Sequence, residues 1–557
     1  MRQMQKMLLA CLLLIIPGFF YPLSGQTTNV SGVINQYFSV TAIDASNESL
    51  TLSTSAASFN TNDEILIIQM QGGTMENADN ANFGNVTSIG GTGLYERATI
   101  CGNTGNEISL QHTLSQSFDD PAASNAVIQV IKFSSYVDVN VNGSLFAPAW
   151  NGATGGVLVL SASGTISLNA DINLNGLGFR GAATETMNSG CAGMPFFSFD
   201  QYFYAQADQG GAKKGEGIIP YEANKDYGKG AQANGGGGGN EHNAGGAGGA
   251  NYGNGGQGGE KTTGGSFTCY GNHPGVGGKN LQTFINASNM MSLGGGGGAG
   301  NDNDGESQDA APGGGIAIIL ADQIEGNGFS ISARGENAAA AAGDAGSGGG
   351  AGGSILLSTN GFGATNLNLD VSGGQGGNAG IAANCLGPGG GGGGGLIRTA
   401  TALSVNVISN VAGGASGVIN ASVTLACAGS QSSATDGQAG AVVNVALLPQ
   451  SSTASSCVLA ARPRIEELEE SEILDIQVYP NPVNRGNEIE ILLESEKDIW
   501  GYVDLLDLKG SKILQQNFEK NVGKTRLAFP THELPKGIYQ LRIILNARLY
   551  TSRLIIQ

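Results

Sequence analysis

The sequence predicts an all-β protein, in which a glycine-rich parallel β-solenoid-like passenger is followed by a small C-terminal β-sandwich domain. Two observations support this prediction. A unit made of a glycine pair, a short apolar strand, a turn and an alternating strand recurs four times in the centre of the chain. The final 85 residues return to ordinary alternating strands that are separated by proline and glycine turns.

Shifts in composition divide the chain into five segments. We expect a signal peptide over 1–25, a β-rich segment over 26–150, the glycine-rich repeats over 151–450, a linker over 451–472 and the C-terminal domain over 473–557.

The N-terminal segment has the features of a secretory signal peptide. Arg2 and Lys6 precede an apolar run over 7–16, and small residues follow at Ser24 and Gly25. The run is shorter than the roughly 20 residues that a spanning helix needs. Cys11 lies inside the apolar run, so lipidation at this cysteine is the less favoured alternative.

Three apolar runs predict strands in the segment that follows the signal peptide. They cover 64–70, 127–131 and 137–141, and no helix-length periodicity of 3.6 residues interrupts them. We therefore expect residues 26–150 to form a β-rich unit.

The four repeat copies predict parallel coils that stack on one another. Since one coil cannot bury its apolar face alone, neighbouring coils must continue the core. In the first copy, alternation points Ile166 and Leu168 one way and Ser167 and Asn169 the other. An antiparallel β-sandwich is the rival architecture. The copies pair residues 157–160 with 166–176, 316–320 with 329–331, 355–357 with 367–373, and 396–398 with a degenerate 403–407.

Long glycine-rich insertions separate the repeat strands, at 235–259, 294–298, 343–353 and 387–395. Glycine supplies 93 of the 557 residues, well above the usual share of about 7%. Such runs are typical of flexible linkers. The alternative is a set of extended, polyproline-II-like chains that pack closely because no Cβ separates them. The sequence leaves both alternatives open.

Charge is concentrated in the passenger. From Arg462 onward there are 13 basic and 15 acidic residues, whereas the passenger has 11 basic and 30 acidic residues, a net charge of −19. Because phosphate binding requires clustered lysine and arginine, the sequence argues against a nucleic-acid partner.

Six cysteines remain once Cys11 is set aside with the signal peptide. An even number in an exported chain favours disulfides, and six cysteines allow 15 full connectivities. We favour two pairs, Cys191 with Cys269 and Cys385 with Cys427, from their positions around the glycine insertions. The other two cysteines are Cys101 and Cys457.

Few motifs in the passenger indicate chemistry, and we assign neither catalytic residues nor a cofactor. The chain lacks a phosphate-binding loop, a nucleophile elbow and a His-Glu-x-x-His zinc motif. The acidic stretch 301–306 suggests calcium, but an EF-hand register with Gly305 at position six places Gly300 at one and Ala311 at twelve. The sequence is therefore compatible only with an irregular calcium site at this stretch, and not with an EF-hand.

An aromatic cluster over 196–204 is the other notable feature of the passenger. Exposed rings beside Asp200 and Asp208 would suit stacking of sugars, whereas buried rings would form an apolar plug on the flank of the solenoid. We favour the plug. The same two interpretations, sugar binding and apolar packing, apply to the segment Phe179-Arg180-Gly181.

The C-terminal domain has several recognisable motifs. Alternation at Ile489, Ile491 and Leu493 predicts a half-buried strand. A proline-rich turn opens the domain, an Asp-Leu-Lys-Gly turn lies in its middle, and a Leu-Pro-Lys-Gly-Ile-Tyr block launches the penultimate strand. The motif residues are Tyr479, Pro480, Asn481, Pro482, Gly510, Leu534, Pro535, Gly537 and Tyr539.

Together these motifs resemble the type IX secretion C-terminal sorting domain of Bacteroidetes, over residues 473–557. The resemblance implies export by the type IX machinery, removal of the domain by a sortase-like peptidase, and attachment of the passenger to surface lipopolysaccharide. It also implies a location at the outer-membrane surface or outside the cell.

For the passenger we expect an adhesin-like or structural role at the cell surface. The alternative is a polysaccharide-acting enzyme or a carbohydrate-binding protein on the solenoid scaffold, with extracellular polysaccharide as the partner. A pair of catalytic carboxylates would be distant in sequence, so the pattern leaves this alternative open.

Overall fold

The computed structural model divides the chain into two compact units, 1–459 and 460–557. The predicted signal peptide, the whole of the predicted linker and the turn that contains Gly510 lie outside the described residues. The structure describes residues 27–45, 48–187, 200–240, 242–261, 272–380, 384–420, 422, 424–445, 448–449, 473–495, 499–506, 512–520, 523–531, 534–545 and 548–557.

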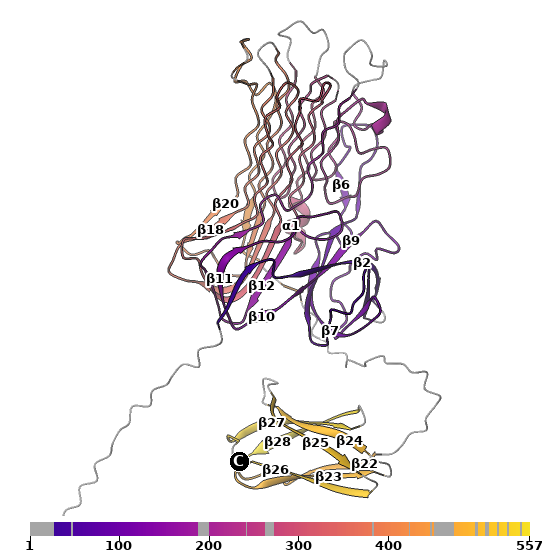
Figure 1. Cartoon of the computed structure of the whole chain (residues 1–557), viewed down its shortest axis with the longest axis vertical. Coiled ribbons are helices and arrows are strands. Elements are labelled where there is room, and N and C mark those ends of the chain that lie inside the picture. Colours follow the sequence, from indigo (N-terminus) through magenta and orange to yellow (C-terminus); the bar gives the residue numbers. More distant parts are fainter. Residues whose placement is uncertain are drawn as a thin grey trace, which may run out of the picture. The chain divides into compact units, whose positions relative to one another are not determined.

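The first unit begins with a closed antiparallel barrel (Figure 1). Its strands run in the order β2-β3-β8-β7-β4-β9, and β4 and β9 confirm the strands predicted at 64–70 and 127–131. Their alternate apolar side chains fill the barrel interior. The bounds are β2 Gln36–Asp44, β3 Ser49–Leu52, β4 Glu64–Gln71, β7 Tyr95–Thr104, β8 Glu107–Leu110 and β9 Val127–Phe133.

The repeats form one 13-stranded parallel sheet together with β1, β10 and β11 of the segment before them, as the solenoid prediction requires. The first strands of successive copies pair in register, so that Val157 lies beside Ile316, which in turn lies beside Ser354. The antiparallel alternative is therefore wrong for the repeats. The strands are β1 Thr27–Gly32, β10 Ser135–Tyr136, β11 Asp138–Leu145, β12 Val157–Ala162, β13 Thr165–Leu168, β14 Ile172–Asn173, β15 Ile316–Glu325, β16 Ser330–Ser332, β17 Ser354–Phe362, β18 Leu367–Asp370, β19 Leu396–Thr399, β20 Val407–Asn410 and β21 Ala441–Val443.

Both faces of the first repeat strand are buried, which explains why this strand is apolar throughout. Val157 and Val159 join a core shared with the barrel, whereas Leu158 and Leu160 join a second core inside the solenoid. The second strand alternates as predicted, with Ile166 buried and Ser167 partly exposed.

Two details of the repeats differ from the prediction. The second strand of the first copy is divided, because residues 169–171 lie between β13 and β14. The strand predicted at 403–407 is wrong, since β20 begins only at Val407. The Ser404 hydroxyl bonds to Asn406 Oδ1 at 2.7 Å, and Val407 N donates to Ser404 O. These local hydrogen bonds favour a turn over a strand.

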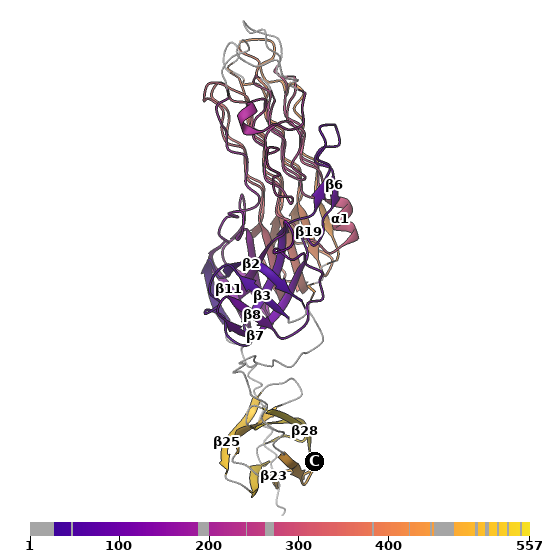
Figure 2. The same ribbon diagram turned by 90° about the vertical axis from the view of Figure 1, so that its right-hand side faces the viewer.

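The glycine insertions form an ordered bundle of extended chains (Figure 2). In the chain 294–299 the backbone partners repeat every three residues, which is the period of a polyproline-II-like helix. This chain donates to three neighbours and accepts from three others. The N–H groups of 294–299 donate to carbonyl groups of 311–314, 247–250 and 213–216. The carbonyl groups of 294–299 accept from N–H groups of 179–182, 348–351 and 236–239.

The glycine bundle thus confirms the polyproline-II-like alternative, and the linker alternative is wrong for these chains. Around many of its glycines the nearest atoms belong to the backbone of neighbouring chains. A Cβ on Gly348 would lie 1.8 Å from the Ala247 carbonyl oxygen, and one on Gly296 would lie 1.9 Å from the Arg180 carbonyl oxygen. Glycine is therefore required by close approach of the chains.

Three of the glycine chains continue directly into a solenoid strand. Gly315 precedes β15, Gly353 precedes β17 and Gly395 precedes β19. The chains run from the sheet to a set of turns at the opposite end of the bundle (Figures 1 and 2). We call these turns the turn end.

Among its described residues, the first unit has a few further elements. A short hairpin pairs β5 (Thr74–Met75) with β6 (Val86–Ser88), and two short helices are present, the 3-10 helix η1 (Gln206–Asp208) and α1 (Gln282–Ala287). Within the described ranges, no helix has both the length and the apolar character needed to cross a membrane.

The second unit has two antiparallel sheets around its own core, as expected for a small β-sandwich. Ile489 and Ile491 are buried in this core, which confirms the predicted alternation. One sheet is β22-β23-β26 and the other is β25-β24-β27-β28. The bounds are β22 Ile473–Tyr479, β23 Glu488–Ser495, β24 Ile499–Leu506, β25 Lys512–Lys520, β26 Gly523–Pro530, β27 Gly537–Leu545 and β28 Arg548–Ile556.

Candidate functional site

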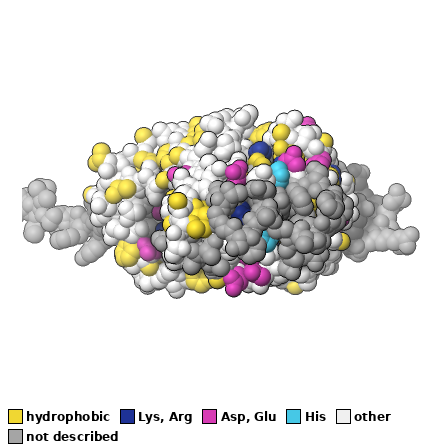
Figure 3. Space-filling view, turned by 90° about the horizontal axis from the view of Figure 1, so that it is seen from above, with side chains coloured by type: hydrophobic (Ala, Val, Ile, Leu, Met, Phe, Trp, Pro, Cys, Tyr) yellow, Lys and Arg dark blue, Asp and Glu magenta, His cyan; other side chains and the backbone are white. Residues whose placement is uncertain are grey.

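The turn end gathers charged side chains from segments that are far apart in the sequence. Asn240 joins two of these segments, because its amide Nδ2 donates to Gln201 O and its backbone N donates to His273 O. Figure 3 views this end of the first unit, where acidic and histidine side chains are visible at the surface. The chemistry of the passenger is therefore sought first among these turns.

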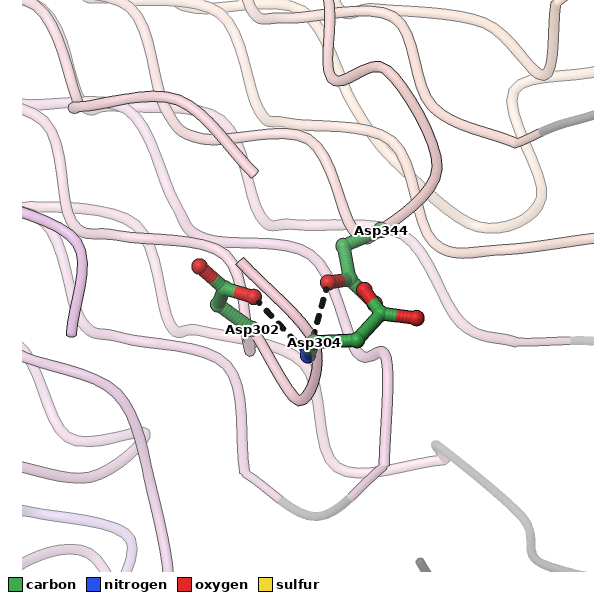
Figure 4. A group of neighbouring side chains, drawn as sticks. All are labelled: Asp302, Asp304 and Asp344. Carbon is green, nitrogen blue, oxygen red and sulfur yellow. Dashed lines mark hydrogen bonds between the residues drawn. The ribbon is translucent and has the colours of Figure 1, made fainter. Parts of the chain in front are cut away.

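Three carboxylates meet at the turn end. Asp302, Asp304 and Asp344 each offer an oxygen atom, and these oxygens all lie within 4.8 Å of one another. Asp302 and Asp304 belong to the turn that the sequence marked for calcium, and Asp344 comes from the next turn of the bundle (Figure 4). Asp344 is only 1% exposed and Asp302 only 4%, whereas Asp304 is exposed.

The surroundings of Asp344 disfavour its charged form. Burial, together with the neighbouring Asp302 and Asp304 carboxyls, raises the pKa of Asp344 to about 9. Its Oδ2 accepts only long hydrogen bonds, of 3.3 to 3.4 Å, from the backbone N–H groups of Asn303, Asp304 and Glu306. Among the described residues its Oδ1 has no hydrogen-bond partner.

Sequence reasoning found two of these three carboxylates and missed Asp344. An EF-hand register looks for ligands within twelve residues, but Asp344 lies 40 residues beyond Asp304 and reaches it through the packing of glycine chains. One signal was present in the sequence. Asp344 is the single carboxylate in the otherwise uncharged stretch 337–369.

Asp200 and Asp208, the predicted sugar-binding carboxylates, have separate roles. Asp200 forms an ion pair with Lys229 and lies 3.5 Å from His273 Nδ1. Its hydrogen bond to Lys229 lowers its pKa. Asp208 Oδ2 accepts a hydrogen bond from Ala205 N at the start of η1. No contact between the two carboxylates is seen in the described part of the chain.

The described part of the aromatic cluster is packed against the protein. Tyr204 is buried with Tyr227 and Met187, and the Phe203 ring lies 5.6 Å from that of Phe83. These contacts agree with the plug interpretation, although the plug lies on the bundle and not on the flank of the solenoid. Residues 196–199 lie outside the described residues.

Arg180, which follows the first repeat, is engaged within the protein. Its guanidinium makes a two-point ion pair with Glu216, with Nε 2.9 Å from Oε2 and Nη2 3.2 Å from Oε1. Trp150 Nε1 donates to the same carboxylate, and the Trp150 ring packs edge-on against Phe179. These residues therefore join the bundle to the solenoid.

A hollow of about 350 Å³ lies between the barrel and the solenoid. Arg97 of the barrel strand β7 lines it, together with Tyr136, Asp322 and Asn360 from the solenoid sheet. A tyrosine ring beside hydrogen-bonding side chains is a suitable combination for a sugar. It is the second candidate site of the passenger.

One of the two predicted disulfides is present. Cys385 and Cys427 are joined, with their Cα atoms 6.0 Å apart. Cys191 and Cys269 lie outside the described residues. Cys101 is also disulfide-bonded.

The motif residues of the C-terminal domain hold its two ends together. Asn481 Nδ2 donates to Arg553 O, and Asn481 Oδ1 accepts from Ile555 N. Tyr539 is buried, and its hydroxyl donates to Pro535 O at 2.7 Å. Leu534 is buried beside it in the core of the domain.

The remaining motif residues have other positions. Gly537 is the first residue of β27. Tyr479, Pro480 and Pro482 are exposed, so they form an accessible surface on the proline-rich turn. Gly510 lies outside the described residues.

This small β-sandwich, attached to a passenger that carries the charge and the candidate sites, defines a targeting module on an exported protein. Residues 477–557 match the family described as the secretion system C-terminal sorting domain, and they form a type IX secretion C-terminal sorting domain. The protein is therefore exported by type IX secretion, interacts with that machinery, and reaches the cell surface or the extracellular space. No curated protein matches the chain.

Proposed function

We propose that the exported passenger acts at the cell surface as an adhesin-like protein, in which the glycine bundle is a stiff carrier for the turn end. The observation that carries the proposal is the division of the first unit. Several bundle chains continue into solenoid strands at one end of the bundle, and the turns at the other end carry acidic and histidine side chains at the surface. Binding residues are commonly held on loops by such rigid scaffolds.

The charge of the turns supports a polar ligand, and extracellular polysaccharide is the class that we favour. Asp200 has an exposed carboxylate beside Lys229 and His273, so hydrogen-bond donors and acceptors lie close together. Polar groups of both kinds recognise the hydroxyl groups of sugars.

Carbohydrate binding at the hollow between barrel and solenoid is the second candidate. It is favoured by Tyr136, Arg97 and Asp322, which offer a ring face, a cation and a carboxylate within one concavity. Cleavage of the polysaccharide would need a pair of catalytic carboxylates, and Asp322 is the single carboxylate among the residues that line this hollow.

Two single substitutions separate these candidates. Purified secreted protein is passed over columns of immobilised acidic and neutral polysaccharides, and the eluate is checked for shortened chains. Asp200→Asn alters the turn end, and Asp322→Asn is the matched change at the hollow. Loss of retention with Asp200→Asn alone supports the adhesin-like turn end, and loss with Asp322→Asn alone supports the hollow. Absence of retention for the unaltered protein on every column contradicts both, and shortened chains indicate an enzyme.

We further propose that a signal peptide directs the chain to the inner membrane for export, and that a sortase-like peptidase then removes the sorting domain and leaves the passenger on surface lipopolysaccharide. The exposed proline-rich turn of that domain supports recognition by another protein. Intact mass spectrometry of surface-released protein is expected to show loss of both the signal segment and the sorting domain. Full-length protein on the surface would contradict removal.

A further inference from the structure

We propose that Asp302, Asp304 and Asp344 bind a calcium ion that ties two turns of the passenger together. The three carboxylates come from two different turns and bring their oxygens within 4.8 Å of one another. Calcium prefers hard oxygen ligands such as carboxylates, and it accepts them from separate segments of a chain.

The second observation is the buried oxygen of Asp344. The side chain is 1% exposed, it points toward Asp304 (Figure 4), and its Oδ1 has no hydrogen-bond partner among the described residues. A buried carboxylate oxygen without a partner is costly, and it is rarely retained unless something else satisfies it. A cation between the carboxylates would satisfy this oxygen.

Charge around the site points in the same direction. None of the three carboxylates forms an ion pair with a lysine, arginine or histidine in the part of the chain that the structure describes. The Glu306 carboxylate lies close by, since its Oε2 is 1.5 Å from where a Cβ on Gly343 would be. The turn end therefore concentrates negative charge here, with His242 as a neighbour that interacts electrostatically with Asp304.

The ligand set favours calcium over magnesium. Calcium accepts six to eight oxygens in irregular arrangements, whereas magnesium requires near-octahedral geometry and keeps much of its water. Asn303 lies between Asp302 and Asp304, and its amide Oδ1 is also buried without a described partner, so it offers a neutral oxygen on the same turn. Exposed Asp304 leaves room for water ligands.

The test uses the mature secreted protein, first treated with EGTA and then given millimolar calcium chloride. Calcium is expected to raise the melting temperature by about 3 °C, because an ion that binds only the folded state stabilises it. Asp344→Asn is expected to remove this rise and to melt higher than the unaltered protein in EGTA, since a neutral amide is less costly to bury there than a carboxyl group beside two others. Asp322→Asn, which removes a carboxylate at the solenoid, should keep the full rise.

Equilibrium dialysis with radioactive calcium gives a second readout that does not depend on Asp344→Asn folding. The exposed position of Asp304 makes Asp304→Asn a mild change, and this variant is expected to lose one bound calcium per chain. A melting temperature that is equal in EGTA and in calcium would overturn the proposal. So would unchanged binding in Asp304→Asn, or stabilisation by magnesium but not by calcium. Polysaccharide retention is not needed for any of these outcomes.

Discussion

The glycine bundle and the β-solenoid are continuous along the chain, yet they are held together in opposite ways. In the solenoid, backbone hydrogen bonds join each strand to its neighbours within the sheet, and buried side chains fill the space on either face, with Ile318 on one face and Ile319 on the other. In the bundle, the backbone of 294–299 bonds to six surrounding chain segments, and the atoms nearest to its glycines are those of the neighbouring backbone.

This difference determines which substitutions each region tolerates. The solenoid buries apolar area, so it is weakened when a side chain is made smaller. The bundle buries backbone that is almost fully hydrogen-bonded, so it is weakened when any side chain is added. A glycine is thus as specific in the bundle as a leucine is in the solenoid.

The largest effect is expected for a methyl group added inside the bundle. In Gly348→Ala the new Cβ would meet the Ala247 carbonyl oxygen, and the chain cannot move aside without breaking bonds to other neighbours. We expect a loss of at least about 3 kcal/mol of unfolding free energy, the upper part of the range for overpacked cores. Thermal unfolding of the secreted protein, followed by circular dichroism, measures it.

Gly361→Ala is the matched control for this substitution. Gly361 lies in β17, and a Cβ there would have nothing within 4 Å, so a change within about 0.5 kcal/mol is expected. Equal melting of the two variants would show that the bundle chains can separate, and the contrast between the regions would then fail.

The next effect is a cavity in the solenoid. Ile318 is fully buried and lies between Val159 and Leu356 of the neighbouring strands. Ile318→Ala is expected to cost about 2–5 kcal/mol while the fold is kept. Chemical denaturation measures the loss. Ile408→Ala, at a position that is 57% exposed on β20, should change little. Similar losses at both positions would argue against a side-chain core.

A smaller effect is expected from the disulfide between Cys385 and Cys427, which joins residues 42 apart in the sequence. Replacing both cysteines with serine is expected to cost about 2–4 kcal/mol, mainly by freeing the unfolded chain. The local result should be faster proteolysis of residues 384–428, as read by mass spectrometry of the fragments. Unchanged cleavage in this segment would contradict a role for the disulfide in holding the turns.

The smallest effect on stability is expected for Lys214, whose amine is buried inside the bundle. Lys214 is fully buried, and its Nζ lies 3.8 Å above the Phe83 ring. Burial lowers the pKa of this amine well below its usual value. The unfolded chain therefore binds more protons, and stability is expected to fall as the pH drops from above 10 toward the lowered folded-state pKa. Lys214→Met should remove this contribution and melt higher at pH 7.

The difference between the two proteins is the quantity to measure, because the charged groups near Lys214 titrate in both. These groups are Asp79, Glu222, Lys225 and Asp226. Melting temperatures from pH 6 to pH 10 should converge as the pH rises. A constant difference across this range would contradict a proton-linked cost at Lys214.

Much of the solenoid could be predicted because its side chains carry the signal. The run 157–160 is apolar throughout because that strand is buried on both faces. Apolar residues alternate at Ile166 and Leu168 because the second strand is buried on one face only. The sorting domain was predicted for the same reason, since its opening turn uses particular residues such as Asn481, whose side chain bonds to β28.

The bundle and its site could be predicted only in part. A glycine run shows that chains approach closely, but identical residues contain no information on which chain lies beside which. The neighbours of 294–299 are fixed by the solenoid strands at the ends of the chains. Asp344 therefore comes close to Asp302 through a register of the chains that no local sequence pattern encodes. Strand β20 begins later than predicted for a different reason, because Ser404 and Asn406 form a local hydrogen bond.

Residue-resolved hydrogen exchange across 294–299 tests the central claim most directly. Every one of these six consecutive amides donates to a backbone carbonyl of a neighbouring chain. We predict that all six exchange as slowly as the amides of the buried strand segment 316–320. Exchange of these glycines at the rate of a free peptide, or protection of only every second amide as in a strand with one neighbour, would contradict the three-residue backbone lattice.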